Sequence, residues 1–71
     1  MQIILNGTEK NFQDQISIAT LIKELGLDER KIAIERNKEI VPRTAFNSIN
    51  LCQGDKIEVV HFIGGGIGSI E

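Results

Sequence analysis

The chain begins with a pattern of apolar and turn residues that is typical of a β-hairpin. Residues 2–5 are mostly apolar, and the dipeptide Asn6-Gly7 follows them directly. That dipeptide is a strong hairpin signal, because a type I′ turn needs a positive φ at both central residues. We therefore expect residues 8–12 to return as the second strand.

A helical spacing of apolar residues comes next. Positions i, i+3, i+4 and i+7 of one helical face are held by Ile18, Leu21, Ile22 and Leu25. Ser17 is suited to the N-cap, where its hydroxyl accepts an otherwise unpaired backbone N–H. Gly26 suits the left-handed position after the last turn, and Leu27 can supply the apolar contact of that motif. The spacing predicts one amphipathic helix of about two to three turns.

The second half of the chain has the patterns of strands and turns. Residues 31–35 alternate apolar and polar side chains, and residues 39–41 form a short run that ends at Pro42. Such alternation predicts strands with one buried face. Residues 43–51 lack a clear period, which predicts a loop with a helical turn. Residues 56–63 have the composition of a final strand.

This order of elements predicts an α+β fold. The order is a hairpin, a helix, two further strands and a last strand. This order fits a mixed sheet of four to five strands around one helix best. That arrangement is the β-grasp, or ubiquitin-like, fold. We expect residues 1–63 to form this domain and residues 64–71 to form a flexible, glycine-rich tail, with a five-residue extension after Gly66.

Composition limits the classes of function. The 71 residues carry a formal net charge of −2, one cysteine and one histidine. The charge argues against a nucleic-acid partner, which needs a basic surface. Without a second cysteine an internal disulfide is impossible, which favours a reducing compartment. The N-terminus has no signal-peptide pattern, and no apolar run approaches the ~20 residues of a membrane span. We expect a cytoplasmic protein that binds no membrane.

Catalytic chemistry is hard to find in the sequence. There is no cluster of metal ligands, no glycine-rich phosphate loop between a strand and a helix, and no Cys-x-x-Cys pair. His61 could act as a general base, but a strand histidine near the end of a sheet is the simpler interpretation. Cys52 has no neighbour in sequence that would lower its pKa, so we expect a half-buried loop thiol. We predict that the chain is not an enzyme and holds no metal or cofactor.

The last strand has an apolar residue pair that a single buried face does not explain. Alternation places Val60 and Phe62 on the face opposite to Ile57 and Val59. If the helix covers the second pair, the first pair is exposed beside the tail, as in a docking surface for a partner. The alternative is that Phe62 folds over an edge of the sheet and a loop half covers Val60.

Three glycines follow that strand. Gly64, Gly65 and Gly66 contribute no side chain to a core and are costly to order. A run of this kind is suited to a thin tail that enters a narrow site on another protein, because a side chain would prevent close approach of the backbone.

Taken together, these residues resemble the ThiS family, the sulfur carrier proteins of thiamine biosynthesis. The likeness covers nearly the whole chain, and its most specific parts are residues 34–43, with Glu-Arg-Asn, and residues 54–66, with Val-His-Phe-Ile-Gly-Gly-Gly. The opening hairpin and residues 20–27 add to it. A diglycine tail alone is also found in ubiquitin-like modifiers and in the small subunits of molybdopterin synthase.

The resemblance implies a carrier that partner enzymes act on. A ThiF-type activating enzyme would adenylate the terminal carboxylate of Gly66 with ATP. Sulfur from a persulfide protein would then displace AMP and leave a thiocarboxylate. Thiazole synthase would use that sulfur to build the thiazole ring. In this scheme Gly64 and Gly65 form the tail, and Val60 and Phe62 dock to the partner.

The chain departs from the family pattern after the glycines. Family members generally stop there, whereas Gly66 is joined here to residues 67–71 and has no free carboxylate. We interpret the sequence as a precursor that a processing protease cuts after Gly66. The alternatives are a tail foreign to the protein, or a relative that has left the sulfur pathway.

Three other functions stay open on the sequence. The chain could carry sulfur for another pathway, such as that of molybdopterin or another metabolite. It could be a protein modifier that is conjugated to lysines. It could also be a β-grasp interaction module whose tail has no chemistry.

Overall fold

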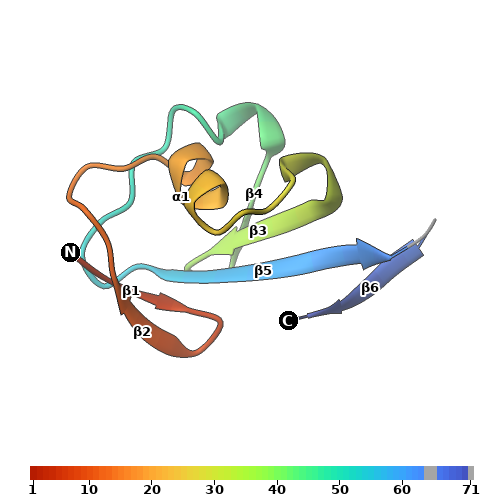
Figure 1. Ribbon diagram of the computed structural model, residues 1–71, viewed down its shortest axis with the longest axis horizontal. Coiled ribbons are helices and arrows are strands. Elements are labelled where there is room, and N and C mark those ends of the chain that lie inside the picture. The colour runs from red at the N-terminus through yellow and green to blue at the C-terminus, as the bar shows by residue number, and fades with distance from the viewer. Residues whose placement is uncertain (64–65, 71) are drawn as a thin grey trace.

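The computed structural model describes residues 1–63 and 66–70 and contains a sheet packed against short helices (Figure 1). The strands are β1 (Gln2–Leu5), β2 (Thr8–Asn11), β3 (Ile32–Arg36), β4 (Glu39–Val41), β5 (Lys56–Ile63) and β6 (Gly66–Ile70). The helical segments are α1 (Ile18–Glu24) and the two 3₁₀ turns η1 (Glu29–Lys31) and η2 (Arg43–Ala45).

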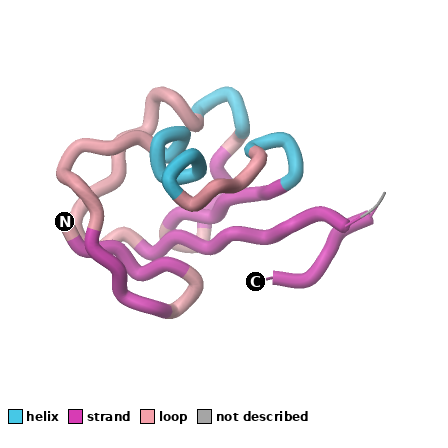
Figure 2. The backbone as a smooth tube through the Cα atoms, viewed as in Figure 1, coloured by secondary structure: helices cyan, strands magenta, loops and turns pink. Residues whose placement is uncertain are grey.

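The sheet is mixed, with the order β2-β1-β5-β3-β4, and β6 pairs with β5 away from this path. The β1–β5 pair is parallel, whereas β1–β2, β3–β4, β3–β5 and β5–β6 are antiparallel. Figure 2 shows the helical segments on one side of these strands. The predicted mixed sheet around one helix is therefore confirmed, with five strands on the main path.

The first turn forms as the sequence predicts. Asn6 and Gly7 both have positive φ angles, of 47° and 83°, between two antiparallel strands. These angles are those of a type I′ turn, whose twist matches that of the flanking strands. The hairpin prediction is confirmed.

The helix has the predicted caps. The Ser17 hydroxyl accepts the backbone N–H of Thr20 at 3.1 Å. At the other end, Gly26 has a φ of 72°, and its N–H donates to the carbonyl of Lys23. The N–H of Leu27 donates to the carbonyl of Ile22, which completes a helix-ending motif of the Schellman type.

The core lies between α1 and the inner face of the sheet. Ile18, Leu21 and Ile22 supply the buried stripe of the helix. Phe46, from the segment after η2, is also buried there, and its carbonyl accepts the N–H of Ala19. The other buried apolar residues are Ile3, Leu5, Ile16, Ile32, Ile34, Val41, Leu51, Ile57 and Val59.

One strand begins later than predicted. Residue 31 is the last residue of η1, and β3 runs over Ile32–Arg36 instead of 31–35. The cause is local, since the Asp28 side chain accepts the N–H of Arg30 and caps the 3₁₀ turn. The Arg30 guanidinium also donates to that carboxylate, and these hydrogen bonds lower the pKa of Asp28 to about 2.

The segment after the glycines includes a strand. We expected a flexible, glycine-rich tail, and the structure has strand β6 at Gly66–Ile70. The physical reason is that β5 extends past β1, so backbone groups on this edge are available for pairing. The division into a domain of residues 1–63 and a flexible tail of residues 64–71 stays a prediction.

Candidate functional site

The candidate site is the second half of β5, which leads directly to the glycines. On one side β5 pairs with β3 from Ile57 to His61. On the other side it pairs with β1 only at Lys56 and Ile57, because β1 ends at the Asn6-Gly7 turn. In Figure 1 the second half of β5 extends beyond the β1–β2 hairpin, with β6 beside it. The sheet thus holds β5 firmly at its start and presents its far end.

A buried carboxylate fixes the start of β5. Asp55 is 6% exposed, and Oδ2 accepts from Arg36 Nε at 2.9 Å and from the Cys52 N–H at 2.8 Å. Its Oδ1 accepts from Asn37 Nδ2 at 3.0 Å. In turn, Asn37 Oδ1 accepts the N–H of Lys56. The Asp55 side chain therefore links the residue just before β5 to Asn37 in the β3–β4 turn and to Cys52.

The same contacts set the charge state of Asp55. Burial alone would raise its pKa, but the hydrogen bonds from Cys52, Asn37 and Arg36 outweigh burial, so the pKa lies below the ordinary value. The Arg36 pKa is raised, chiefly by its hydrogen bond to Asp55. Both groups are charged at neutral pH.

We expect the domain to lose stability in acid for this reason. A carboxyl whose pKa is lower in the folded than in the unfolded state stabilises the fold above its unfolded pKa, and this contribution disappears as the pH falls through the folded value. For Asp55 the loss begins at about pH 4, the ordinary aspartate value. Urea denaturation at pH 7 and at stepwise lower pH measures it. A matched series on Asp55→Asn should lack most of this decline, and an equally steep decline in that variant would contradict the assignment.

Of the two residues predicted to be exposed, Phe62 is exposed and Val60 is only partly so. Ile57 and Val59 are buried at 0% and 3% exposure, so the inner face of β5 is the one predicted. On the opposite face Phe62 is 38% exposed, whereas Val60 is only half-buried. Neither position is covered by the helix. Their role in docking stays a prediction.

Among the residues whose burial is described, the most exposed large apolar side chain is Ile40, at 66% exposure, which the sequence patterns had not singled out. In the sheet register Ile40 is opposite Glu35, and Glu35 is opposite Glu58. Paired residues share a face, so Ile40 lies on the same face as Val60 and Phe62. A signal in the sequence is that Ile40 and Val41 are adjacent in a strand, so their side chains lie on opposite faces and only one of them can face the core.

We call the face of the sheet that carries Ile40, Val60 and Phe62, opposite α1, the outer face. This face also carries an unfavourable charge pair. Glu35 and Glu58 are direct neighbours on β3 and β5. Like charges opposite each other in a sheet are destabilising. Within residues 1–63, neither carboxylate forms an ion pair. A basic side chain of a partner would relieve this repulsion.

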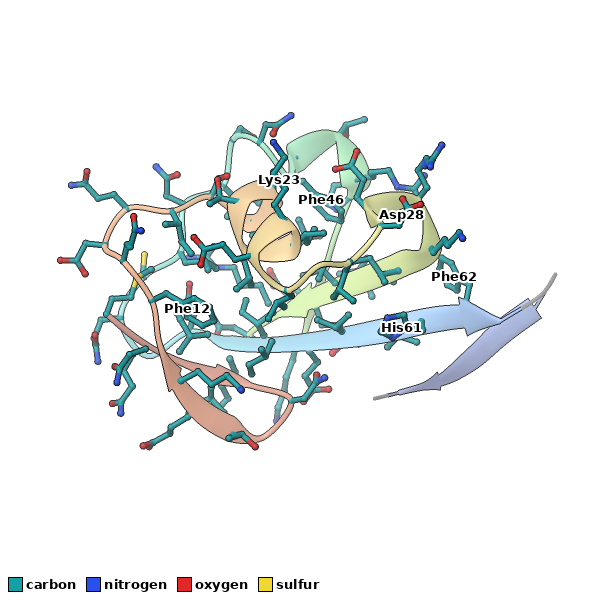
Figure 3. The ribbon with its side chains drawn as sticks, in the orientation of Figure 1. Phe12, Lys23, Asp28, Phe46, His61 and Phe62 are labelled. Carbon is teal, nitrogen blue, oxygen red and sulfur yellow. The ribbon has the colours of Figure 1, made fainter. Side chains whose placement is uncertain are left out.

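The two residues considered for catalysis are not brought together. Figure 3 shows His61 on β5, next to Phe62. The imidazole is half-buried, and its Nδ1 has no hydrogen-bond partner in the described part of the chain. This agrees with a strand histidine near a sheet end. Cys52 is exposed, not half-buried as predicted, with its sulfur 3.6 Å from the Arg36 guanidinium.

Of the glycines, Gly66 begins β6 and is opposite Ile63 in the register. Gly64 and Gly65, which belong to the predicted tail, lie outside the described residues. The thiocarboxylate chemistry of Gly66 stays a prediction. Across residues 1–63 and 66–70, there is no group of three or more His, Cys, Asp or Glu side chains that could hold a metal ion. No helix in the described residues has the length and apolarity needed to cross a membrane.

Comparison with known proteins gives a consistent result. Residues 3–66 match the ThiS family, so the match ends at Gly66. The "Sulfur carrier protein ThiS" of Bacillus subtilis is 38% identical over 63 residues, which cover 87% of this chain and 96% of that protein. A "Thiazole synthase" of Paramagnetospirillum magneticum is 47% identical over 66 residues, or 93% of this chain. The chain spans only 20% of that enzyme's length.

A solved structure agrees with the fold. The crystal structure of the thiamine biosynthesis protein ThiS from Geobacter metallireducens has a TM-score of 0.81 and 26% sequence identity. The alignment covers 93% of this chain and all of that one. The predicted β-grasp fold is thereby confirmed. The prediction of a sulfur carrier is confirmed by the family and by the Bacillus subtilis relative. The chain belongs to the ThiS family of sulfur carrier proteins.

Proposed function

We propose that this chain carries sulfur for thiazole formation in thiamine biosynthesis, as a thiocarboxylate on Gly66. The observation that carries the proposal is the place of Gly66. The family match ends at this residue, and β5 leads to it from the ordered sheet. A glycine there can enter a narrow active site of a partner, because no side chain prevents close approach.

The chemistry belongs to partner enzymes. A carboxylate is a poor electrophile, so a ThiF-type enzyme would first convert the Gly66 carboxylate into an acyl adenylate with ATP. Sulfur from a persulfide protein would then displace AMP. The carrier contributes only its acyl end and a surface for docking. These steps place the protein in the cytoplasm, where ATP and reduced thiols are available.

Thiazole synthase is the proposed acceptor of the sulfur. Two thiazole synthases, from Paramagnetospirillum magneticum and Magnetococcus marinus, contain a segment that is 47% and 44% identical to this chain. Each match covers about a fifth of the enzyme, so the rest of the enzyme lies outside it. A carrier-like segment within the same polypeptide as the enzyme supports a direct transfer between the two.

The outer face is the proposed docking surface. It combines the exposed side chains of Ile40 and Phe62 with the half-buried Val60. Glu35 and Glu58 lie between the apolar residues and repel each other. Protein interfaces combine apolar anchors with charged groups that the partner complements, and we expect the activating enzyme to place a basic side chain between the two glutamates.

Removal of residues 67–71 would precede activation. In the full chain the carbonyl of Gly66 is part of a peptide bond to Ile67 and offers no carboxylate. A processing protease that cuts after Gly66 would create one. Intact mass of the protein from its native cells tests this step, since finding only the full-length form would exclude processing.

The function is tested with three versions of the chain, which end at Glu71, Gly66 and Gly65. Each is incubated with the ThiF-type enzyme, ATP and a persulfide donor, and then analysed by intact mass spectrometry. We expect exchange of one oxygen for sulfur in the chain that ends at Gly66, and none in the full chain. The chain that ends at Gly65 controls for position and should react much less. A thiocarboxylate on the full chain, or on none of the three, would overturn the proposal. Adducts with lysines in place of a thiocarboxylate would indicate a protein modifier.

A further inference from the structure

The edge of β5 beyond β1 has backbone groups that the main sheet does not pair. The carbonyl of Ile57 accepts the N–H of Asn6 at 2.9 Å, and the N–H of Val59 donates to Asn6 Oδ1 at 2.8 Å. Odd-numbered residues of β5 therefore direct their backbone groups to this edge. By the alternation of a strand, the next groups here belong to His61 and Ile63.

Strand β6 takes this edge, but it pairs imperfectly. Gly66 is opposite Ile63 and Ile67 is opposite Phe62, after which the register shifts by a bulge between Phe62 and Val60. A bulge places one extra residue of β6 opposite His61, and this extra residue weakens the ladder without uncovering the edge. Two of the five residues of β6 are glycines, which weaken a strand. The pairing of β6 is thus suited to release.

We propose that β6 is a built-in competitor for a strand-docking site on the edge of β5. In the full chain β6 covers the backbone groups of His61 and Ile63. When residues 67–71 are gone, an extended segment of the activating enzyme pairs with the same edge. This inference rests on the proposed function for the identity of the partner, but the covering of the edge by β6 does not depend on it.

The occupant is an extended, mainly apolar peptide segment for two reasons. An exposed sheet edge binds partners by adding a strand, in which main-chain hydrogen bonds give affinity. The segment that occupies the edge in this chain is itself extended and uncharged from Gly66 to Ile70. A partner strand of regular register would have no extra, unpaired residue opposite His61, where β6 has its bulge. Such a partner has a stronger ladder than β6.

The same pairing also controls processing. The bond between Gly66 and Ile67 lies between two residues that are both in register with β5. A protease needs access to this backbone, so β6 has to leave β5 before the cut. Release of β6 therefore exposes the scissile bond and the docking edge in one step.

Amide hydrogen exchange tests the covering of the edge. We expect the amides of His61 and Ile63 to exchange about tenfold faster in the chain that ends at Gly66 than in the full chain. The amide of Val60 points to β3 and is the internal control, with less than about a twofold change. Equal exchange of His61 and Ile63 in both chains would overturn the proposal.

Binding to the ThiF-type enzyme, measured by calorimetry without ATP, tests the competition. Gly68→Pro in the full chain removes a backbone donor and interrupts β6, whereas Gly68→Ala keeps the donor and is the matched control. Neither variant can be adenylated, because Gly66 stays in a peptide bond, so affinity is separated from chemistry. We expect Gly68→Pro to bind about tenfold more tightly than Gly68→Ala, close to the chain that ends at Gly66.

The outcomes separate the two proposals. Equal affinity of all forms would overturn the competition and leave the sulfur-carrier function intact. Absence of binding by the chain that ends at Gly66 would overturn the proposed function and the partner named here. In that case the exchange of His61 and Ile63 still decides whether β6 covers the edge.

Discussion

Replacing Asp55 with alanine is expected to destabilise the domain by about 3 kcal/mol, the lower end of the range for breaking a buried ion pair. The variant leaves the Arg36 guanidinium without its partner at 2.9 Å, and leaves Asn37 Nδ2 and the Cys52 N–H without their acceptor. The cost stays at the lower end because the Arg36 side chain is 28% exposed and keeps some contact with water. A domain of this size has only about 3–5 kcal/mol in total, so much of the variant should be unfolded at neutral pH.

Urea denaturation followed by circular dichroism measures this change. The matched control is Asp28→Ala, which also removes a carboxylate hydrogen-bonded to an arginine and to a backbone N–H. Asp28 and Arg30 are on the surface, where such pairs contribute little, so the control should lower the denaturation midpoint much less than Asp55→Ala does. If Asp55→Ala is too unstable to purify, Asp55→Asn retains one acceptor and should show a smaller loss. Equal midpoints for the Asp55 and Asp28 variants would contradict the role of this network.

The elements that the sequence predicts well are those with local signals. The Asn6-Gly7 turn and the Ser17 cap each depend on residues within a few positions of each other. Strand β4 follows from the short run that Pro42 stops, and β5 follows from the strand pattern of residues 56–63. Local backbone preferences and the apolar pattern point to the same structure at these places.

The features that the sequence analysis missed depend on distant residues. Arg36 and Asp55 are 19 positions apart and meet only because β3 and β5 are neighbours. Strand β6 has little strand propensity of its own, and it forms because β5 extends past β1. The Glu35–Glu58 pair follows from the sheet register, which the separate strand patterns do not fix.

The candidate site is divided in the same way. Inner and outer faces of β5 follow from alternation, so Phe62 was correctly placed away from the helix. That Ile40 belongs to the same face could be known only from the pairing of β4 with β3. The sulfur of Cys52 lies 3.6 Å from the Arg36 guanidinium, a contact between distant residues that no local pattern indicates.

Replacing Phe62 with aspartate is expected to weaken binding to the ThiF-type enzyme by about 10- to 100-fold, the range for loss of an aromatic anchor at an interface. Phe62 is 38% exposed on the outer face, next to the start of the tail. An aspartate there removes apolar contact and adds a third negative charge to a face that already holds Glu35 and Glu58. The experiment uses the chain that ends at Gly66, so that β6 has no part in the result.

Two further variants separate docking from folding and from charge. Phe62→Leu keeps an apolar side chain and should bind within a fewfold of the unaltered chain. Ile40→Asp adds the same charge two strands away and should also weaken binding, because Ile40 lies on the same face at 66% exposure. Denaturation midpoints should be nearly unchanged in all three, since both positions face solvent. If Phe62→Asp binds as tightly as the unaltered chain, the outer face is not the docking surface. If Phe62→Asp alone weakens binding and Ile40→Asp does not, the partner contacts only the end of β5 that leads to Gly66.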